Sequence, residues 1–262
     1  YLCARRIGLR SGDRRLSGAQ PIFVPGLPED KVRAIYGRAA GNEIASGKFA
    51  SPQSSAALAA NGFGWFLDRP SDCPLFPPVA DLGGTVTAVA IECELRFPWS
   101  GGRHPWLDAV VWTDTHVIGV ESKRYEPFRD SKVAELADAY DRDVWGEGMQ
   151  GWCAMRDLLR AEPRRYKHLD AAQLVKHALG LATEGNRSGL SPVLVYLYAE
   201  PQDACRNPQE AFLAHRREIE DFHGIVAGNR VRFAACSWRG WLACFTGEAA
   251  DHARAVHEAF AP

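Results

Sequence analysis

The sequence predicts an α/β protein with one mixed central sheet flanked by helices. Runs rich in β-branched and aromatic residues, typical of strands, lie at 85–97, 107–113, 117–121, 191–200 and 231–238. Short polar connections join the first three runs, which indicates an antiparallel meander. The fourth run follows a helical pattern, so we expect it to join the same sheet through a crossover. No fixed repeat period is present, which excludes a solenoid.

Composition is that of an ordinary globular chain: 262 residues, 46% hydrophobic, 24% charged, net charge −1. We expect a single domain over 1–262, with 1–30 as an irregular Arg-, Gly- and Pro-rich arm that holds one short strand at 21–24. No apolar run predicts a signal peptide or a membrane span, so we expect a cytoplasmic protein without a membrane partner. Seven cysteines without a C-x-x-C pair indicate reduced thiols.

Two helical patterns precede the strands. Spaced apolar residues predict a helix from Glu29 to about Lys48, which carries Glu43. Ser51 is the expected cap of a second helix that ends near Asn61. A Pro-rich connection over 68–84 then leads to the first strand.

The second and third runs form a hairpin around the polar tetrad 113–116. If the turn centres on Asp114-Thr115, cross-strand partners have numbers that sum to 229, so Asp108 lies opposite Glu121 (108 + 121 = 229). Lys123 lies two residues beyond Glu121, and the period-2 alternation of a strand puts both on one face. Two carboxylates and an ammonium are therefore expected to converge.

Such a group has two interpretations. One is an ion network of Asp108, Lys123 and Glu121 at the end of a sheet. The other is a divalent-cation site, because carboxylate oxygens are the ligands of Mg²⁺. A turn near Gly101 would also bring Glu94 opposite Asp108, which makes Glu94 either a reserve ligand or an exposed strand residue.

The segment Pro105-Trp-Leu-Asp108, followed by Glu121-Ser-Lys123, resembles the PD-(D/E)XK motif of the restriction-endonuclease-like nuclease superfamily. Here the proline precedes the aspartate by three residues rather than one. The resemblance implies an αβββαβ core with extra helical insertions. It also implies Mg²⁺ or Mn²⁺ held by Asp108, Glu121 and the Ser122 carbonyl, with Glu43 completing the site and Lys123 stabilising the transition state.

Helices are expected after the hairpin. The apolar spacing predicts them at 131–145, with Asp130 or Ser131 as its cap, and at 152–159, 169–183, 208–226 and 247–260, while 241–245 is expected to extend or pair with the last strand. One flank of the helix at 169–183 resembles a Gln-x-x-x-Tyr motif of an exonuclease-related branch. Gln173 matches, His177 stands in place of the Tyr, and Lys176 lies between them. Gln173 would orient water or a phosphate and Lys176 would neutralise a phosphate; the alternative is a solvent-facing helix.

We therefore expect a metal-dependent nuclease that hydrolyses phosphodiester bonds of DNA, with RNA as an alternative substrate and a homodimer as a compatible state. The near-neutral charge argues against very tight nonspecific DNA binding but not against cleavage. Two rival hypotheses stand beside it. One is a catalytically inactive nuclease-fold module that binds nucleic acid or a protein, and the other is a metal hydrolase of small phosphoesters.

Overall fold

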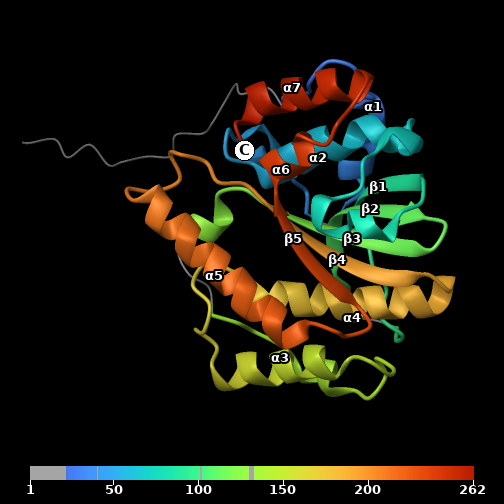
Figure 1. The fold of residues 1–262 in the computed structure, drawn as a ribbon, viewed down its shortest axis with the longest axis vertical. Coiled ribbons are helices and arrows are strands. Elements are labelled where there is room, and N and C mark those ends of the chain that lie inside the picture. Colours follow the sequence, from blue (N-terminus) through green and yellow to red (C-terminus); the bar gives the residue numbers. More distant parts are fainter. Residues whose placement is uncertain (1–21, 40, 101, 130–132) are drawn as a thin grey trace, which may run out of the picture.

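A five-stranded mixed sheet forms the middle layer of the computed structural model, which describes residues 22–39, 41–100, 102–129 and 133–262 (Figure 1). The spatial order of the strands is the order of the chain, β1-β2-β3-β4-β5. The first three strands run antiparallel, and β3, β4 and β5 run parallel. Their bounds are Val86–Glu94 (β1), Trp106–Thr113 (β2), His116–Lys123 (β3), Ser191–Tyr198 (β4) and Arg232–Ser237 (β5). The α/β class and the mixed central sheet are confirmed.

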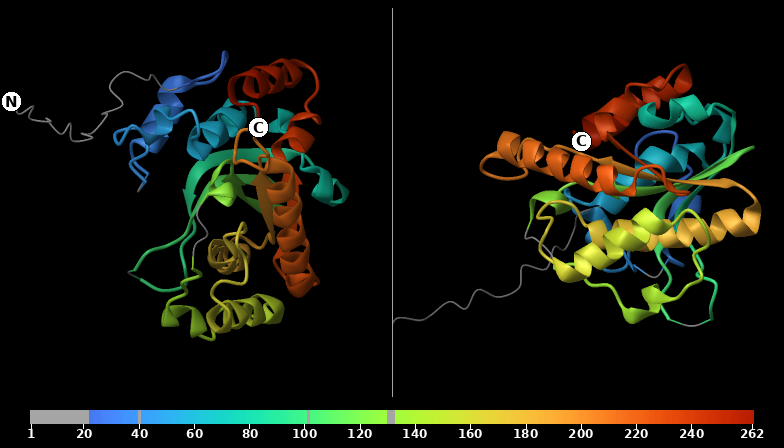
Figure 2. Two further views of the ribbon diagram at one scale, coloured as in Figure 1. Left: turned by 90° about the vertical axis from the view of Figure 1, so that its left-hand side faces the viewer. Right: turned by 60° about the horizontal axis from the view of Figure 1, so that its bottom comes forward.

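Four helices cover one face of the sheet, which we call the upper face (Figures 1 and 2). They are α1 (Glu29–Tyr36), α2 (Ser55–Gly64), α6 (Trp238–Leu242) and α7 (Glu248–Phe260). Helix α2 begins where the Ser54 hydroxyl accepts a hydrogen bond from the backbone N–H of Ala57, and its Ala-rich sequence lets it lie fully buried. A Cβ at Gly62 would lie 2.5 Å from the Trp238 ring, so only glycine allows this contact between α2 and α6.

The other face, which we call the lower face, is covered by α3 (Gln150–Ala161), α4 (Ala171–Ser188) and α5 (Pro208–Val226). Helix α4 is the crossover between β3 and β4, and Asp170 caps it by accepting a hydrogen bond from the N–H of Gln173. Gly119 of β3 allows α4 to pack closely, because a Cβ there would lie 2.4 Å from Leu107 and 2.8 Å from Leu181.

Short 3₁₀ helices occupy the connections, at Lys48–Ala50, Trp65–Leu67, Pro70–Asp72, Pro77–Leu82, Glu126–Phe128 and Asp138–Asp141. Within the described ranges no helix is long and apolar enough to cross a membrane. Six cysteines are described, and all six are free thiols: Cys73, Cys93, Cys153, Cys205, Cys236 and Cys244.

The hairpin register is confirmed. Ala109 pairs with Val120, Val110 with Gly119, Val111 with Ile118 and Trp112 with Val117, and each pair sums to 229. This places Asp108 level with Glu121 at the end of the sheet where β3 and β4 finish.

Several expected elements differ from the structure. The first helix ends at Tyr36, so Glu43 lies in a turn rather than on a helix, and the second helix is capped by Ser54 rather than Ser51. Residues 133–145 form no α-helix and hold only the 3₁₀ turn Asp138–Asp141, while the proposed caps Asp130 and Ser131 lie outside the described residues. Residues 22–24 are not a strand, and position 21 and most of the arm lie outside the described residues.

Among the secondary-structure elements, the predicted strand at 241–245 is also wrong. Trp238 and Trp241 instead belong to the short helix α6, because two indoles three residues apart pack together on one helical face. Both indoles are fully buried in the upper-face core.

Candidate active site

The candidate site lies at the edge of the sheet where β3 and β4 end, between the upper and lower helix layers (Figure 1). Strand β1 also ends at this edge, and β2 begins there, because β1 and β3 are both antiparallel to β2. Ligand sites of α/β sheets commonly lie outside the carboxyl ends of parallel strands. The side chains at this edge form two groups.

The first group is buried on the lower face and consists of Glu121, Lys123 and His177; we call it the buried ion group. Lys123 Nζ lies 2.5 Å from Glu121 Oε1, so the expected shared face of these two residues is confirmed. His177 Nδ1, on α4, lies 3.1 Å from Glu121 Oε2. The Glu121 side chain is only 2% exposed, and Lys123 is 15% exposed. One carboxylate is thus held by two nitrogen-bearing side chains.

The second group lies toward the upper face and consists of Glu43, Glu92 and Asp108; we call these the cleft acids. Together with Ser55 and Glu126 they line a cleft of about 910 Å³, open mouth included. Asp108 Oδ2 accepts a hydrogen bond from the backbone N–H of Ser122 at 2.6 Å. The contact ties Asp108 to the strand that carries Glu121 and Lys123.

Glu92, and not Glu94, is the residue of β1 that stands opposite Asp108. Ile91 pairs with Ala109, and Cys93 pairs with Leu107. The residue numbers of each pair sum to 200, so residue 92 lies opposite residue 108. The expected place of Glu94 was therefore wrong by two residues. Glu94 instead pairs with Trp106 and forms an exposed ion pair with Arg96 at 3.2 Å.

The backbone at Glu92 is unusual, because its φ is +48° and the residue is not glycine. A left-handed residue inside a strand is costly and is found where the surroundings enforce it, most often at functional sites. Because of this conformation, two successive side chains of β1 lie on the same face of the sheet. Ile91 packs in the upper-face core, and Glu92 lies in the cleft on that side. The strained residue thus places a third acid beside Asp108.

The two groups differ in electrostatics. Burial raises the pKa of Glu92 to about 7, with further increases from Glu43 and Glu121, although the neighbouring Tyr36 hydroxyl opposes them. Burial, and then the nearby Glu121 carboxylate, raise the pKa of Asp108 well above its usual range. Burial alone would raise the pKa of Glu121 as well, but Lys123 and His177 outweigh it and lower that pKa to about 2. Lys123 also lowers the pKa of Asp108, but there it does not outweigh burial and the Glu121 carboxylate, and Lys48 and Arg129 are the basic residues that line the cleft itself.

Asp108 and Glu121 are level with each other, but their side chains have different partners. Glu121 is near enough to raise the pKa of both Asp108 and Glu92. Among the described residues, however, no three His, Cys, Asp or Glu side chains are already arranged to hold a metal ion. The predicted register is confirmed, but the expected convergence on one face is not: the Asp108 carboxylate lies in the upper-face cleft, whereas Glu121 and Lys123 lie on the lower face beside α4.

Ser122 lies between Glu121 and Lys123 in the chain, and both its backbone N–H and its hydroxyl form hydrogen bonds. Its N–H donates to Asp108, and its Oγ accepts a buried hydrogen bond from Trp238 Nε1 at 3.2 Å. Glu126 lies next to the site and accepts hydrogen bonds from Ser55 Oγ at 2.5 Å and from the N–H of Arg124 at 2.9 Å. Burial alone would raise the pKa of Glu126, but Lys123 and the hydrogen bond from Ser55 outweigh it and lower that pKa.

The predicted flank of α4 is divided by burial. Gln173 and Lys176 are half-buried and His177 is buried; all three line a groove with Arg103 and Trp106, and His177 also contacts Glu121. Within the described ranges Lys176 has no ion-pair partner. Sequence reasoning missed Glu92, since it named only Glu94 of this strand, and it noted His177 only as the residue in place of the Tyr of the helix motif.

The donor set suits a hard divalent cation. Glu43, Glu92 and Asp108 offer only carboxylate oxygens, the ligands that Mg²⁺ and Mn²⁺ prefer. The raised pKa values of Glu92 and Asp108 come from burial and from neighbouring carboxylates, and a bound cation would oppose both causes, as Lys123 already does in part for Asp108. In their chemistry the residues fit such an ion.

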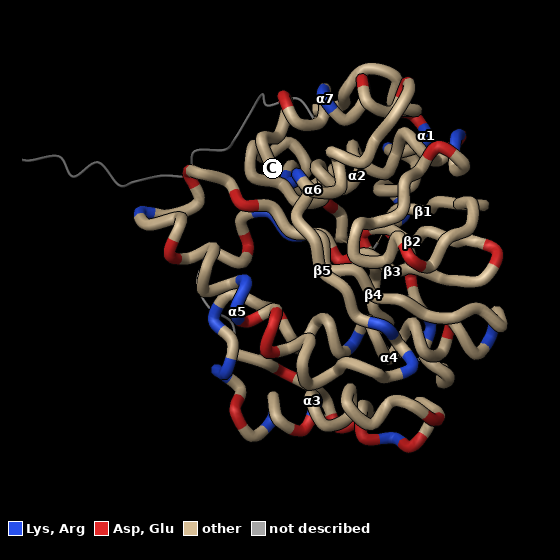
Figure 3. The backbone as a smooth tube through the Cα atoms, in the orientation of Figure 1, with Lys and Arg blue, Asp and Glu red and all other residues tan. Residues whose placement is uncertain are grey.

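Comparison of the chain with protein-family models, with curated proteins and with solved structures gave no match. Figure 3 shows acidic and basic residues spread over all layers of the fold, in keeping with the net charge of −1.

Proposed function

We propose that this protein is a metal-dependent nuclease with a restriction-endonuclease-like core, which hydrolyses phosphodiester bonds of DNA. The observation that supports this most is the register of the β2–β3 hairpin. It puts Asp108 level with a buried Glu121-Ser122-Lys123 segment at the end of the sheet. The chain order, with helices before an antiparallel three-strand meander and a helical crossover to a parallel fourth strand, is the order of that core.

In this proposal Asp108 and Glu121 hold Mg²⁺ or Mn²⁺, with the Ser122 carbonyl as a further ligand. Glu92 takes the place expected of Glu94, and Glu43 completes the acidic cleft. The bound ion would lower the pKa of a water molecule and stabilise charge on the phosphate. Lys123 and His177 lower the pKa of Glu121 to about 2, so it is ionised across the neutral range, and a bound cation would share this carboxylate with them.

The role of Lys123 follows from its surroundings. Burial lowers its pKa, but Glu121 and Asp108 outweigh burial and raise the pKa above its usual value. The side chain therefore carries a positive charge at neutral pH and serves poorly as a general base. We assign it to stabilise negative charge on the phosphate in the transition state. Glu121 contacts the Lys123 ammonium directly, and His177 contacts the other oxygen of Glu121.

The test is cleavage of supercoiled and linear DNA with Mn²⁺ or Mg²⁺, with EDTA as the blank. Asp108→Asn retains an acceptor for the Ser122 N–H, so the fold should persist while cleavage falls at least about 100-fold. Lys123→Met should reduce cleavage to a similar extent, and because it also removes the partner of the buried Glu121 carboxylate, it is assayed at a temperature where circular dichroism shows it to be folded. If both variants, shown to be folded by circular dichroism, cut DNA like the parent, the site assignment is wrong.

A second function is favoured by one specific observation. Glu121 is already neutralised by Lys123 and His177, and the described residues hold no finished metal site. A nuclease-fold module that binds nucleic acid or a protein without cutting would have this arrangement. Calorimetric titration with Mn²⁺ separates the two: the nuclease binds the ion, and Asp108→Asn and Glu92→Gln weaken that binding, whereas the module shows no binding at this site.

A further inference from the structure

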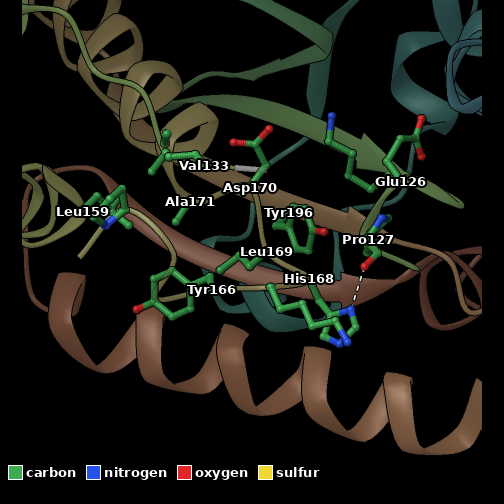
Figure 4. A pocket seen from close by; sticks show the side chains of 15 residues that line it. Glu126, Pro127, Val133, Leu159, Tyr166, His168, Leu169, Asp170, Ala171 and Tyr196 are labelled. Carbon is green, nitrogen blue, oxygen red and sulfur yellow. Dashed lines mark hydrogen bonds between the residues drawn. The ribbon is translucent and has the colours of Figure 1, made fainter. Parts of the chain in front are cut away.

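A pocket beside Lys123 has no role in the chemistry described above. It lies on the lower face between the ends of β3 and β4, the 3₁₀ turn Glu126–Phe128, and the connection from α3 to α4 (Figure 4). The pocket and its open mouth together enclose about 560 Å³ of space. The walls are mostly apolar or aromatic, with Pro127, Leu159, Pro163, Tyr166, Leu169 and Tyr196 among them.

The pocket is continuous with the candidate site. Lys123 lines it, and Glu126 lines both this pocket and the cleft of Asp108 and Glu92. A molecule whose phosphate lies against the Lys123 ammonium would therefore have its neighbouring group at the mouth of the pocket.

The polar side chains of the wall include Glu126, His168 and Asp170. In Figure 4 the carboxylates of Asp170 and Glu126 lie on one side of the pocket and Tyr166 lies on the other. Asp170 uses Oδ1 to cap α4, and its second oxygen has no hydrogen-bond partner among the residues that the structure describes. His168 Nδ1 lies 2.7 Å from the Pro127 carbonyl, which holds the imidazole in the wall.

These observations fit a flat, partly polar ring attached to a phosphate. We propose that the pocket binds one unpaired nucleobase next to the phosphate held at Lys123. Aromatic walls stack on any base, and a single free acceptor such as Asp170 can bind an exocyclic amino group. A base inside a duplex cannot enter such a pocket without leaving its stack. The preferred substrate of the proposed nuclease would therefore be single-stranded, or unpaired at the cleavage point.

This inference rests on the proposed function, and its test does not require cleavage. The probe is a fluorescein-labelled single-stranded DNA 12-mer of mixed sequence, titrated in EDTA by anisotropy. It is compared with a 12-mer of the same length in which every second nucleotide is abasic. Loss of a stacked base costs about 1–3 kcal/mol, so the abasic strand should bind roughly 5- to 150-fold more weakly.

Two exposed valines provide matched variants. Val133 is 43% exposed and lines the pocket, whereas Val144 is 42% exposed and does not. Val133→Trp should cover the mouth and abolish the difference between the two strands, while Val144→Trp should retain it. Both substitutions add the same side chain at a surface position, so folding is expected in both.

The outcomes are distinct. Equal binding of the normal and abasic strands by the parent, no binding of either strand, or an unchanged preference in Val133→Trp would each overturn the pocket assignment. A preserved base preference in a protein that cleaves no DNA with Mn²⁺ would support the pocket and overturn the nuclease proposal alone.

Discussion

The two groups at the edge of the sheet hold similar side chains in opposite electrostatic states. In the buried ion group, Glu121 lies between Lys123 and His177, and its pKa is lowered to about 2. Among the cleft acids, Glu92 has no such cation, and burial raises its pKa to about 7. Glu121 is also the more deeply buried of the two. The comparison therefore shows that neighbours, and not burial, decide which carboxylate is ionised.

The largest effect is expected when the buried ion group loses its cation. Lys123→Met leaves Glu121 buried with only His177 beside it, so the free energy of unfolding should fall by about 3–5 kcal/mol. Urea unfolding followed by tryptophan fluorescence measures this.

Lys176→Met is the matched control, since Lys176 is half-buried and has no ion-pair partner within the described ranges; its change should stay within about 0.5 kcal/mol. The double variant Lys123→Met with Glu121→Gln should regain part of the loss, because no buried charge then stays unpaired. A loss below about 1 kcal/mol in Lys123→Met would contradict the compensation that distinguishes the two groups.

The opposite sign is expected in the cleft. Because burial raises the pKa of Glu92 from 4.5 to about 7, the folded protein holds a proton that the unfolded chain releases. This contributes stability that is present below pH 4.5 and is lost as the pH rises through about 7. Glu92→Gln removes the dependence, so it should stabilise the protein by about 2 kcal/mol at pH 8, in EDTA, and by little at pH 4.5.

Glu94→Gln provides the control, because Glu94 lies two residues away on the same strand and its partner Arg96 is exposed. It should change the free energy of unfolding by less than about 0.5 kcal/mol at either pH. Adding Mn²⁺ should shrink the gain of Glu92→Gln at pH 8, since an ion bound by the parent stabilises the parent alone. Equal effects of the two substitutions would remove the distinction between Glu92 and Glu94.

Much of this geometry could be predicted from sequence. The tetrad 113–116 fixed one turn, and every observed β2–β3 pair follows from it. The connection between β1 and β2 is longer and includes Gly102 at a φ of +81°, so its bend was misplaced and the register moved by two residues. A short turn determines a register, whereas a loop of eleven residues leaves it to packing.

Tertiary packing decided what local patterns left open. The periodicity at 133–145 is helical, yet the segment is irregular apart from a single 3₁₀ turn, and Trp145 packs against Phe97 and Trp99. His177 lies on the same helix as Leu174 and Ala178, and only the position of β3 above α4 brings it to Glu121. No spacing in the chain encodes that contact, because the two residues are 56 positions apart and belong to different elements.

The smallest effect tests the residue that lies between the two groups. Ser122 donates its N–H to the cleft acid Asp108, and its hydroxyl accepts the N–H of the buried Trp238. Ser122→Ala keeps the first contact and removes the second, which leaves an indole N–H without an acceptor; the free energy of unfolding should fall by about 1–2 kcal/mol. Adding Ser122→Ala to Trp238→Phe should cost clearly less than adding it to the parent, because the donor is already gone. Equal costs in the two backgrounds would mean that the hydrogen bond contributes nothing.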